Sequence, residues 1–214
     1  MTRAGPIGSY SDAMPLGTYR VLDGSGTPVG TEEFRCATAP AGWRYFSSIT
    51  TDEPTPHRES VDLVVDREGR PVRCRIDTGS HELLVAPGAG TLAGTRDGEP
   101  IEEPWASDTH LDYLSPCFNA ATAARLEGTT EIEVVFIEPV TCALRRERQR
   151  YERLGPQDVA TPVGRFQAEA WRYTALSSGW SRRLWVAGSI VVAYEDLFEL
   201  MAYEPGQSGP FTLS

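Results

Sequence analysis

The sequence predicts a mostly β protein: an antiparallel barrel, half-barrel or roll of about ten strands with one short helix. Three observations predict this fold class. Apolar and polar residues alternate with period two along many short segments, Gly- and Asp-containing turns separate these segments, and one segment alone carries helical start and stop signals. Alternation of this kind is typical of antiparallel sheets with one buried and one solvated face. We expect a flexible arm over residues 1–14 and a single domain over residues 15–214, because 214 residues suit one large β domain.

The first half of the chain is predicted to form a meander of strands. Tyr19 and Val21 alternate with polar neighbours before a turn at residues 23–26, and the returning strand carries Phe34 and Cys36 on one face. The segments that continue this alternation are residues 42–49, 61–65, 72–76, 81–85 and 91–95. The turn at residues 66–69 makes the pair 61–65 and 72–76 the clearest hairpin.

The helix is predicted after Ser115. Ser115 suits the N-cap, Pro116 suits the first helical position, and residues 117–126 are rich in Ala. Gly128 follows where a left-handed C-terminal cap is expected.

The last third returns to strands. The predicted strands are residues 131–137, 164–175, 182–187, 189–194 and 198–203. The Arg-rich run at residues 144–153 fits either a strand with a solvated face or a short helix, and we favour the strand.

Composition excludes several classes of function. A net charge of -10 and a pI near 4.8 argue against a nucleic-acid partner, because an acidic surface repels phosphates. All 20 basic residues are Arg, so Schiff-base and lysine-nucleophile mechanisms are not available. This bias is typical of a high-GC bacterial gene. No secretory signal follows Met1, and the longest apolar stretch, residues 184–194, is too short to span a bilayer, so we expect a cytoplasmic protein.

Motif searches give no metal site, cofactor site or catalytic set. His57, His81 and His110 lack the short spacings of metal ligands, and no nucleophile elbow or phosphate-binding loop is present. The cysteines lack a C-x-x-C pair and are predicted to be buried free thiols; they are Cys36, Cys74, Cys117 and Cys142. We therefore predict no cofactor and assign no catalytic residue.

Short segments along most of the chain resemble a bacterial spiral β-roll family of uncharacterised domains. The segments are residues 17–21, Val29-Gly30, residues 65–71, residues 161–166 and residues 184–187. The resemblance implies a roll related in shape to lipid-carrier half-barrels and a role in handling lipid-like or other small molecules. Family members usually carry an export signal, which this sequence lacks.

Aromatic residues are the main candidates for a site, because Trp and Tyr are common where an apolar wall meets a few polar anchors. Glu169 shares its strand face with Trp171 and Tyr173, so that face is either external or lines a cavity with a polar group. The full set of predicted ligand-binding residues is Trp43, Tyr45, Tyr113, Glu169, Trp171, Tyr173 and Trp185. Packed core is the competing interpretation for the aromatic members.

These observations favour binding of a hydrophobic small molecule, polyketide- or lipid-like, in an aromatic-lined cavity of the roll. The alternative is a cofactor-free cyclase of natural-product biosynthesis, of the [4+2] type, that acts by confining its substrate. A structural or protein-interaction module is a third hypothesis and predicts exposed apolar patches. A closed, aromatic-lined cavity above roughly 300 Å³ would support either of the first two, whereas a filled interior would contradict both as functions of an enclosed cavity. The sequence leaves open whether the protein forms a homodimer.

Overall fold

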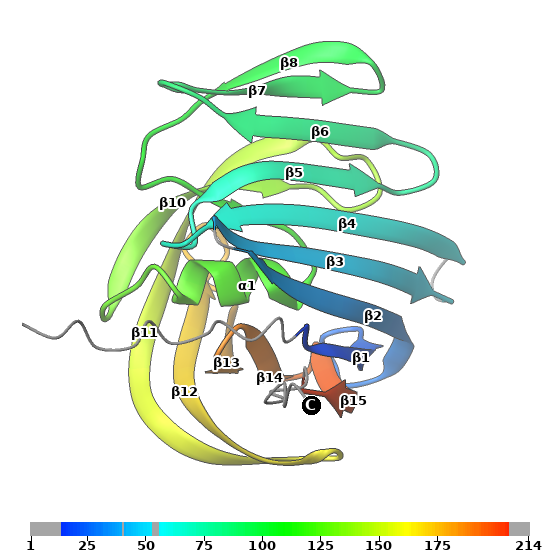
Figure 1. Cartoon of the computed structure of the whole chain (residues 1–214), viewed down its shortest axis with the longest axis vertical. Coiled ribbons are helices and arrows are strands. Elements are labelled where there is room, and N and C mark those ends of the chain that lie inside the picture. The colour runs from blue at the N-terminus through cyan, green and yellow to red at the C-terminus, as the bar shows by residue number, and fades with distance from the viewer. Residues whose placement is uncertain (1–13, 40, 53–55, 206–214) are drawn as a thin grey trace, which may run out of the picture.

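The structure, a computed structural model, describes residues 14–39, 41–52 and 56–205. These residues form one 15-stranded sheet that curls around a single helix (Figure 1). The strand order across the sheet is β8-β7-β6-β5-β4-β3-β2-β1-β15-β14-β13-β12-β11-β10-β9. Residues 1–13 of the predicted N-terminal arm lie outside the described residues.

The elements follow the predicted order along the chain. The strands of the first half are β1 (Leu16–Leu22), β2 (Pro28–Ala39), β3 (Gly42–Thr51), β4 (His57–Asp66), β5 (Pro71–Asp77), β6 (Glu82–Pro87), β7 (Thr91–Arg96) and β8 (Glu99–Pro104). The remaining elements are β9 (His110–Asp112), α1 (Pro116–Ala123), β10 (Thr130–Ile137), β11 (Leu144–Thr161), β12 (Gly164–Ala175), β13 (Ser181–Ala187), β14 (Ile190–Tyr194) and β15 (Phe198–Glu204).

The prediction of a mostly β, barrel-like protein is confirmed, and two of its details are wrong. The sheet has 15 strands instead of about ten, and its edge strands β8 and β9 do not pair with each other, so the barrel is open. The predicted number of strands is too low partly because two strands lack the alternation that reveals a strand: β9 has only three residues, and β8 is rich in Glu and Pro. Neighbouring strands pair antiparallel except β9 and β10, which pair in parallel.

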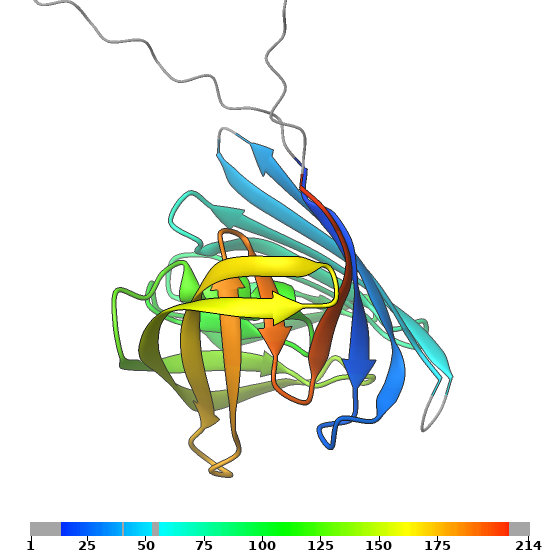
Figure 2. The same ribbon diagram turned by 90° about the horizontal axis from the view of Figure 1, so that it is seen from below.

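The two chain halves meet in the middle of the sheet. β1 pairs with β2 on one side and with β15 on the other, so the described N- and C-terminal strands lie side by side (Figure 2). The meander β1–β8 runs outward from this seam in one direction, and β15 back to β9 runs outward in the other.

The helix α1 fills the interior of the curl. All eight of its residues are buried, and Figure 1 shows it between the two halves of the sheet. Cys117, Phe118 and Ala121 pack in the core formed mainly by β2–β7, whereas Ala120 and Ala123 pack in the core formed mainly by β12–β15. Small Ala side chains allow the helix to approach both walls closely.

The start of α1 is as predicted, but its end is not. Ser115 is the N-cap residue and Pro116 opens the helix, yet α1 ends at Ala123 and Gly128 does not cap it. The Ser115 side chain makes no capping hydrogen bond. The Ser115 hydroxyl instead donates a hydrogen bond to the Glu32 carboxylate of β2.

The hairpin of β11 and β12 extends beyond its neighbours. β12 pairs with β13 only from Glu169 to Thr174, and the tip of the hairpin crosses the outer side of the last strands (Figure 2). Two contacts hold it there: Phe166 stacks edge-to-face on Tyr203 of β15, and Trp185 of β13 donates to Gln157. The strand interpretation of residues 144–153 is confirmed, and the strand runs on to Thr161.

No helix in the described ranges is long and apolar enough to cross a bilayer.

Candidate functional site

The interior of the curl is largely filled. Two small pockets lie beside α1, one of about 50 Å³ and one of about 10 Å³. Both are far below the roughly 300 Å³ expected of a cavity that encloses a whole ligand. Neither pocket is the large internal cavity that the sequence predicted, and α1 with its buried neighbours occupies much of the space inside the curl.

The larger of these two pockets lies beside the first turn of α1, and we call it the Asp112 pocket. Six aromatic rings form most of its wall, and Asp112, Ser115 and Asn119 supply its polar groups. The complete lining is Asp112, Tyr113, Leu114, Ser115, Asn119, Phe136, Tyr173, Trp180, Tyr194, Leu197 and Phe198. An apolar aromatic wall with a few converging polar groups is typical of small-molecule sites.

Asp112 is the only carboxylate in the wall of this pocket. Its side chain accepts hydrogen bonds from Gln149 Nε2 (2.6 Å) and from the backbone N–H of Tyr113 (2.9 Å). The residue is 7% exposed, and burial raises its pKa to about 6; the nearby Glu147 carboxylate acts in the same direction, and the two hydrogen bonds act against it.

The rim of the pocket is partly exposed. Leu114 is 50% exposed, and Phe136, Trp180 and Leu197 are half-buried. The polar end of the pocket is thus buried while its apolar rim reaches solvent.

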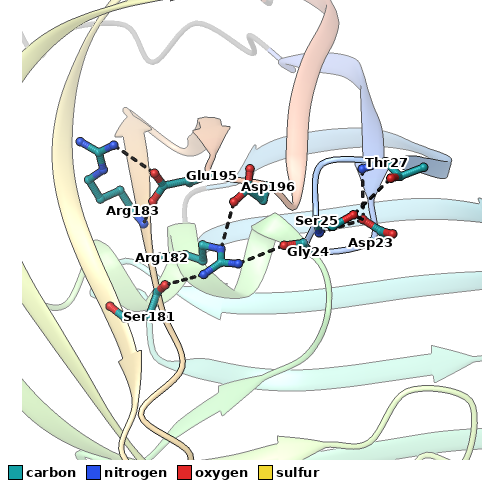
Figure 3. A network of polar contacts seen from close by, with 9 residues as sticks. All are labelled: Asp23, Gly24, Ser25, Thr27, Ser181, Arg182, Arg183, Glu195 and Asp196. Carbon is teal, nitrogen blue, oxygen red and sulfur yellow. Dashed lines mark hydrogen bonds and ion pairs between the residues drawn. The ribbon is translucent and has the colours of Figure 1, made fainter.

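A polar network centred on Arg182 lies next to Trp180; Figure 3 shows the polar residues of this network. The Arg182 guanidinium lies 5.0 Å from the centre of the Trp180 ring. It donates to the carbonyls of Gly24 and Ser181, both at 3.0 Å, and pairs with Asp196 at 3.4 Å. The network joins the β1–β2 turn, the start of β13 and the β14–β15 turn at one side of the rim.

A second buried carboxylate, Glu32 of β2, lies on the other side of the α1 N-terminus. Its Oε1 accepts a hydrogen bond from the Ser115 hydroxyl (2.6 Å), while its Oε2 and the nearby Ser47 hydroxyl have no hydrogen-bond partner among the described residues. Burial raises the pKa of Glu32 to about 7. The adjoining pocket of about 10 Å³, also lined by Tyr45, is about the size needed for one water molecule.

A third carboxylate, Glu59 of β4, accepts a hydrogen bond from the Tyr113 hydroxyl and pairs with His57 Nε2 at 3.1 Å. Two carboxylates of the sheet, Glu32 of β2 and Glu59 of β4, therefore bond to the segment that follows Asp112. Burial, followed by the charge of Glu59, raises the pKa of Tyr113 well above its usual value.

The seven predicted site residues are distributed over several places. Tyr113 and Tyr173 line the Asp112 pocket, and Tyr45 lines the Glu32 pocket. Trp171 is buried in the core next to Tyr151, and Trp43 packs against the other core.

Glu169 and Trp185 lie away from both pockets. Glu169 is 24% exposed along its side chain and pairs with Arg153 at 2.8 Å. Trp185 is on the outer side of β13, beside the exposed Arg183 and under the tip of the β11–β12 hairpin.

The predictions omitted most of the polar residues of these sites. The inward position of Glu32 could have been predicted from the sequence, because Glu32 has the same strand parity as the apolar residues Phe34 and Cys36. The positions of Asp112 and Asn119 could not have been predicted in this way. Asp112 lies in β9, which is too short to show alternation, and Asn119 lies in a helix that is buried on all sides.

The described residues contain no group of three His, Cys, Asp or Glu side chains placed to hold a metal ion. The prediction of buried free thiols is confirmed for all four cysteines.

Two larger hollows lie on the outside of the sheet, each of about 460 Å³ and open to solvent. One is polar and lies near Arg125, Glu131 and Arg148. The other lies between the hairpin tip and the outer side of β13–β15 and includes Trp185.

Comparison with known proteins gives a likeness of fold. No protein-family model and no curated protein matches the chain. A solved structure of a DUF1089 family protein from Pseudomonas aeruginosa superposes with a TM-score of 0.55 at 20% identity, over 93% of this chain and 97% of that one. A β-barrel-like protein of the domain of unknown function DUF1849 from Brucella abortus superposes with a TM-score of 0.51 at 10% identity, over 93% and 100%. These neighbours support the expected likeness to uncharacterised β-barrel-like proteins.

Proposed function

We propose that the protein binds a hydrophobic small molecule, with one end of the ligand in the Asp112 pocket. The observation that carries this proposal is a buried carboxylate at the base of a pocket whose wall is aromatic and whose rim is apolar and partly exposed. Buried polar groups in such a setting orient a ligand, and the aromatic wall supplies most of the contact area.

The size of the pocket defines how the ligand is held. A volume of about 50 Å³ accommodates a small end group and not a polyketide or a complete lipid. The remainder of the ligand would lie across the rim, on Leu114, Leu197 and Trp180. This geometry favours binding over the alternative of a cyclase, because catalysis by confinement needs a chamber that encloses the reacting chain.

The interaction-module hypothesis has less support from the surface. Phe46 and Leu84 are exposed on the outer side of the sheet, but Asp62 and Arg75 lie between them in register. Charged residues therefore interrupt the apolar surface that a protein partner would need.

Two tryptophans provide a matched test of the site. Trp180 and Trp185 are both half-buried, and each has an Arg guanidinium over its ring, at 5.0 and 5.5 Å. Only Trp180 lines the Asp112 pocket, whereas Trp185 lines the outer groove. We expect Trp180→Ala to weaken binding of 1-octanol, measured by titration calorimetry, about tenfold and Trp185→Ala to leave it unchanged, because a buried aromatic contact contributes about 1.5–3 kcal/mol. The reverse result would place the ligand in the outer groove, and octanol binding that neither substitution weakens would refute the Asp112 pocket as the site.

A further inference from the structure

The charge around the Asp112 pocket indicates the charge of the ligand group that binds there. Asp112 accepts hydrogen bonds from two neutral donors, and the ion pairs of the described residues do not include it. A buried carboxylate with no positive partner is unfavourable, and a cation that binds beside it removes that cost.

The charged and titratable groups near Asp112 leave the pocket negative. They are Glu147, Arg145 and Tyr151 of β11, Tyr173 of β12, Arg182 of β13 and Tyr194 of β14. Arg145 is shared between Glu138 and Glu147, with N–O distances of 2.7 and 2.5 Å, so it does not neutralise Asp112. Arg182 bonds to the Gly24 and Ser181 carbonyls and pairs with Asp196 (Figure 3), and it is not among the residues that line the pocket.

The wall adds a second preference for a cation. The faces of Trp and Tyr rings attract an ammonium group, and the attraction is strongest where water is excluded. Tyr173, Trp180 and Tyr194 line the pocket together with Asp112.

From the unpaired carboxylate and the aromatic wall we infer that the Asp112 pocket binds the protonated amine of an amphipathic molecule. This inference rests on the proposed function and adds the class of ligand to it. The apolar part of such an amine would lie on the rim residues Leu114 and Leu197, outside the narrow base of the pocket.

Three probes with the same alkyl chain test the inference: octylammonium, 1-octanol and octanoate, each titrated into the full-length protein at pH 7.5. We expect octylammonium to bind at least tenfold more tightly than octanol, and octanoate to bind more weakly than both. Asp112→Asn should abolish the difference between octylammonium and octanol. Glu32→Gln is the matched control, because it removes the carboxylate on the other side of α1, and it should preserve the difference.

The pH dependence of the wild-type protein gives an independent readout should Asp112→Asn fail to fold. Because the pKa of Asp112 is about 6, octylammonium affinity should fall severalfold between pH 7.5 and pH 5 while octanol affinity stays constant. Equal affinity for octanol and octylammonium, or a preference for octanoate, would overturn the amine inference and leave the binding proposal intact. If none of the three probes binds, the proposed function itself fails.

Discussion

A carboxylic acid that is taken out of water holds its proton more tightly, and Glu32 is such an acid. Its pKa is raised from 4.5 to about 7 because it is fully buried, and the Ser115 and Ser47 hydroxyls only partly oppose this effect. Since the folded state binds this proton more tightly than the unfolded state, Glu32 contributes stability below about pH 4.5 that is lost as the pH rises through 7.

Glu32→Gln should therefore make the protein less sensitive to alkaline conditions. Keeping Glu32 ionised in the fold costs on the order of 3 kcal/mol, because each tenfold change in proton affinity corresponds to about 1.4 kcal/mol. We expect the variant to match the wild type near pH 4.5 and to exceed its free energy of unfolding by about 2–3 kcal/mol at pH 8. Urea denaturation across this range measures the difference, and parallel pH profiles for the two proteins would contradict the assignment.

Trp171 is a core residue, so replacing it should lower the free energy of unfolding. It is 3% exposed, pairs in register with Leu184 and contacts the buried Tyr151 ring edge-to-face. Trp171→Ala should lower the free energy of unfolding by about 3–5 kcal/mol. Trp185→Ala, on the outer side of the next strand, should cost clearly less, and equal losses in thermal or urea denaturation would show that the two positions are packed alike.

At the scale of elements, the fold depends on how α1 is seated between the two cores. The β4–β5 turn contributes to this seat: Gly69 has φ +78°, and a Cβ at this position would lie 2.9 Å from the carbonyl oxygen of Ala121. Gly98 in the β7–β8 turn has a similar φ of +84° but has no atom within 4 Å of the corresponding position.

Substituting each of these two glycines by Ala distinguishes the cost of backbone strain from the cost of a clash with the helix. Gly98→Ala should cost about 1–2 kcal/mol, the usual penalty for Ala in the left-handed region. Gly69→Ala carries the same penalty and in addition displaces the end of α1, so we expect it to lower the free energy of unfolding by a further 1–3 kcal/mol or so. If denaturation gives equal losses for the two variants, the β4–β5 turn does not help to position the helix.

Local patterns in the sequence indicate the elements better than they indicate the arrangement of those elements. Ser115 and Pro116 gave the start of α1, and the alternation of Leu63 with its neighbours gave β4. The end of α1, the 18 residues of β11 and the crossing of its hairpin tip depend on contacts between distant segments, such as Trp185 with Gln157. Local patterns do not contain these contacts.

The candidate site was only partly predictable for the same reason. Tyr113 and Tyr173 were selected as aromatic residues suited to a pocket, and both line the Asp112 pocket. Nothing in the local sequence indicated that Asp112, 61 positions before Tyr173, would lie beside it. The position of α1, which reduces the expected cavity to a small pocket, likewise follows from packing and not from helix propensity.

At the scale of the whole molecule, the open barrel leaves β8 as a free edge. Its sequence, Glu99-Pro-Ile-Glu-Glu-Pro104, combines three acidic residues with two prolines that have the same strand parity. Proline removes a backbone donor from the edge, and negative charges repel a second copy of the same edge.

Replacing these features should promote association. We expect the double substitution Pro100→Thr and Glu102→Thr to produce concentration-dependent oligomers, because it restores a donor and removes a charge. Glu33→Thr on the internal strand β2 is the control and should leave the mass unchanged. Light scattering after size-exclusion chromatography provides the measurement, and an unchanged mass for the double variant would show that other features protect this edge.

The pairing of β1 with β15 also sets the order in which the protein can assemble on the ribosome. Arg20 pairs with Glu199 and the Tyr19 hydroxyl bonds to the Val191 carbonyl, so these contacts join positions 179 and 172 residues apart. The meander β1–β8 needs only residues already synthesised, whereas the exposed side of β1 must wait for nearly the whole chain to emerge. At typical rates of about 5–20 residues per second, β1 stays uncovered for on the order of ten seconds. The nascent chain therefore passes through a stage in which a half-formed sheet presents an unpaired inner strand, and chaperones are best placed to act at that stage.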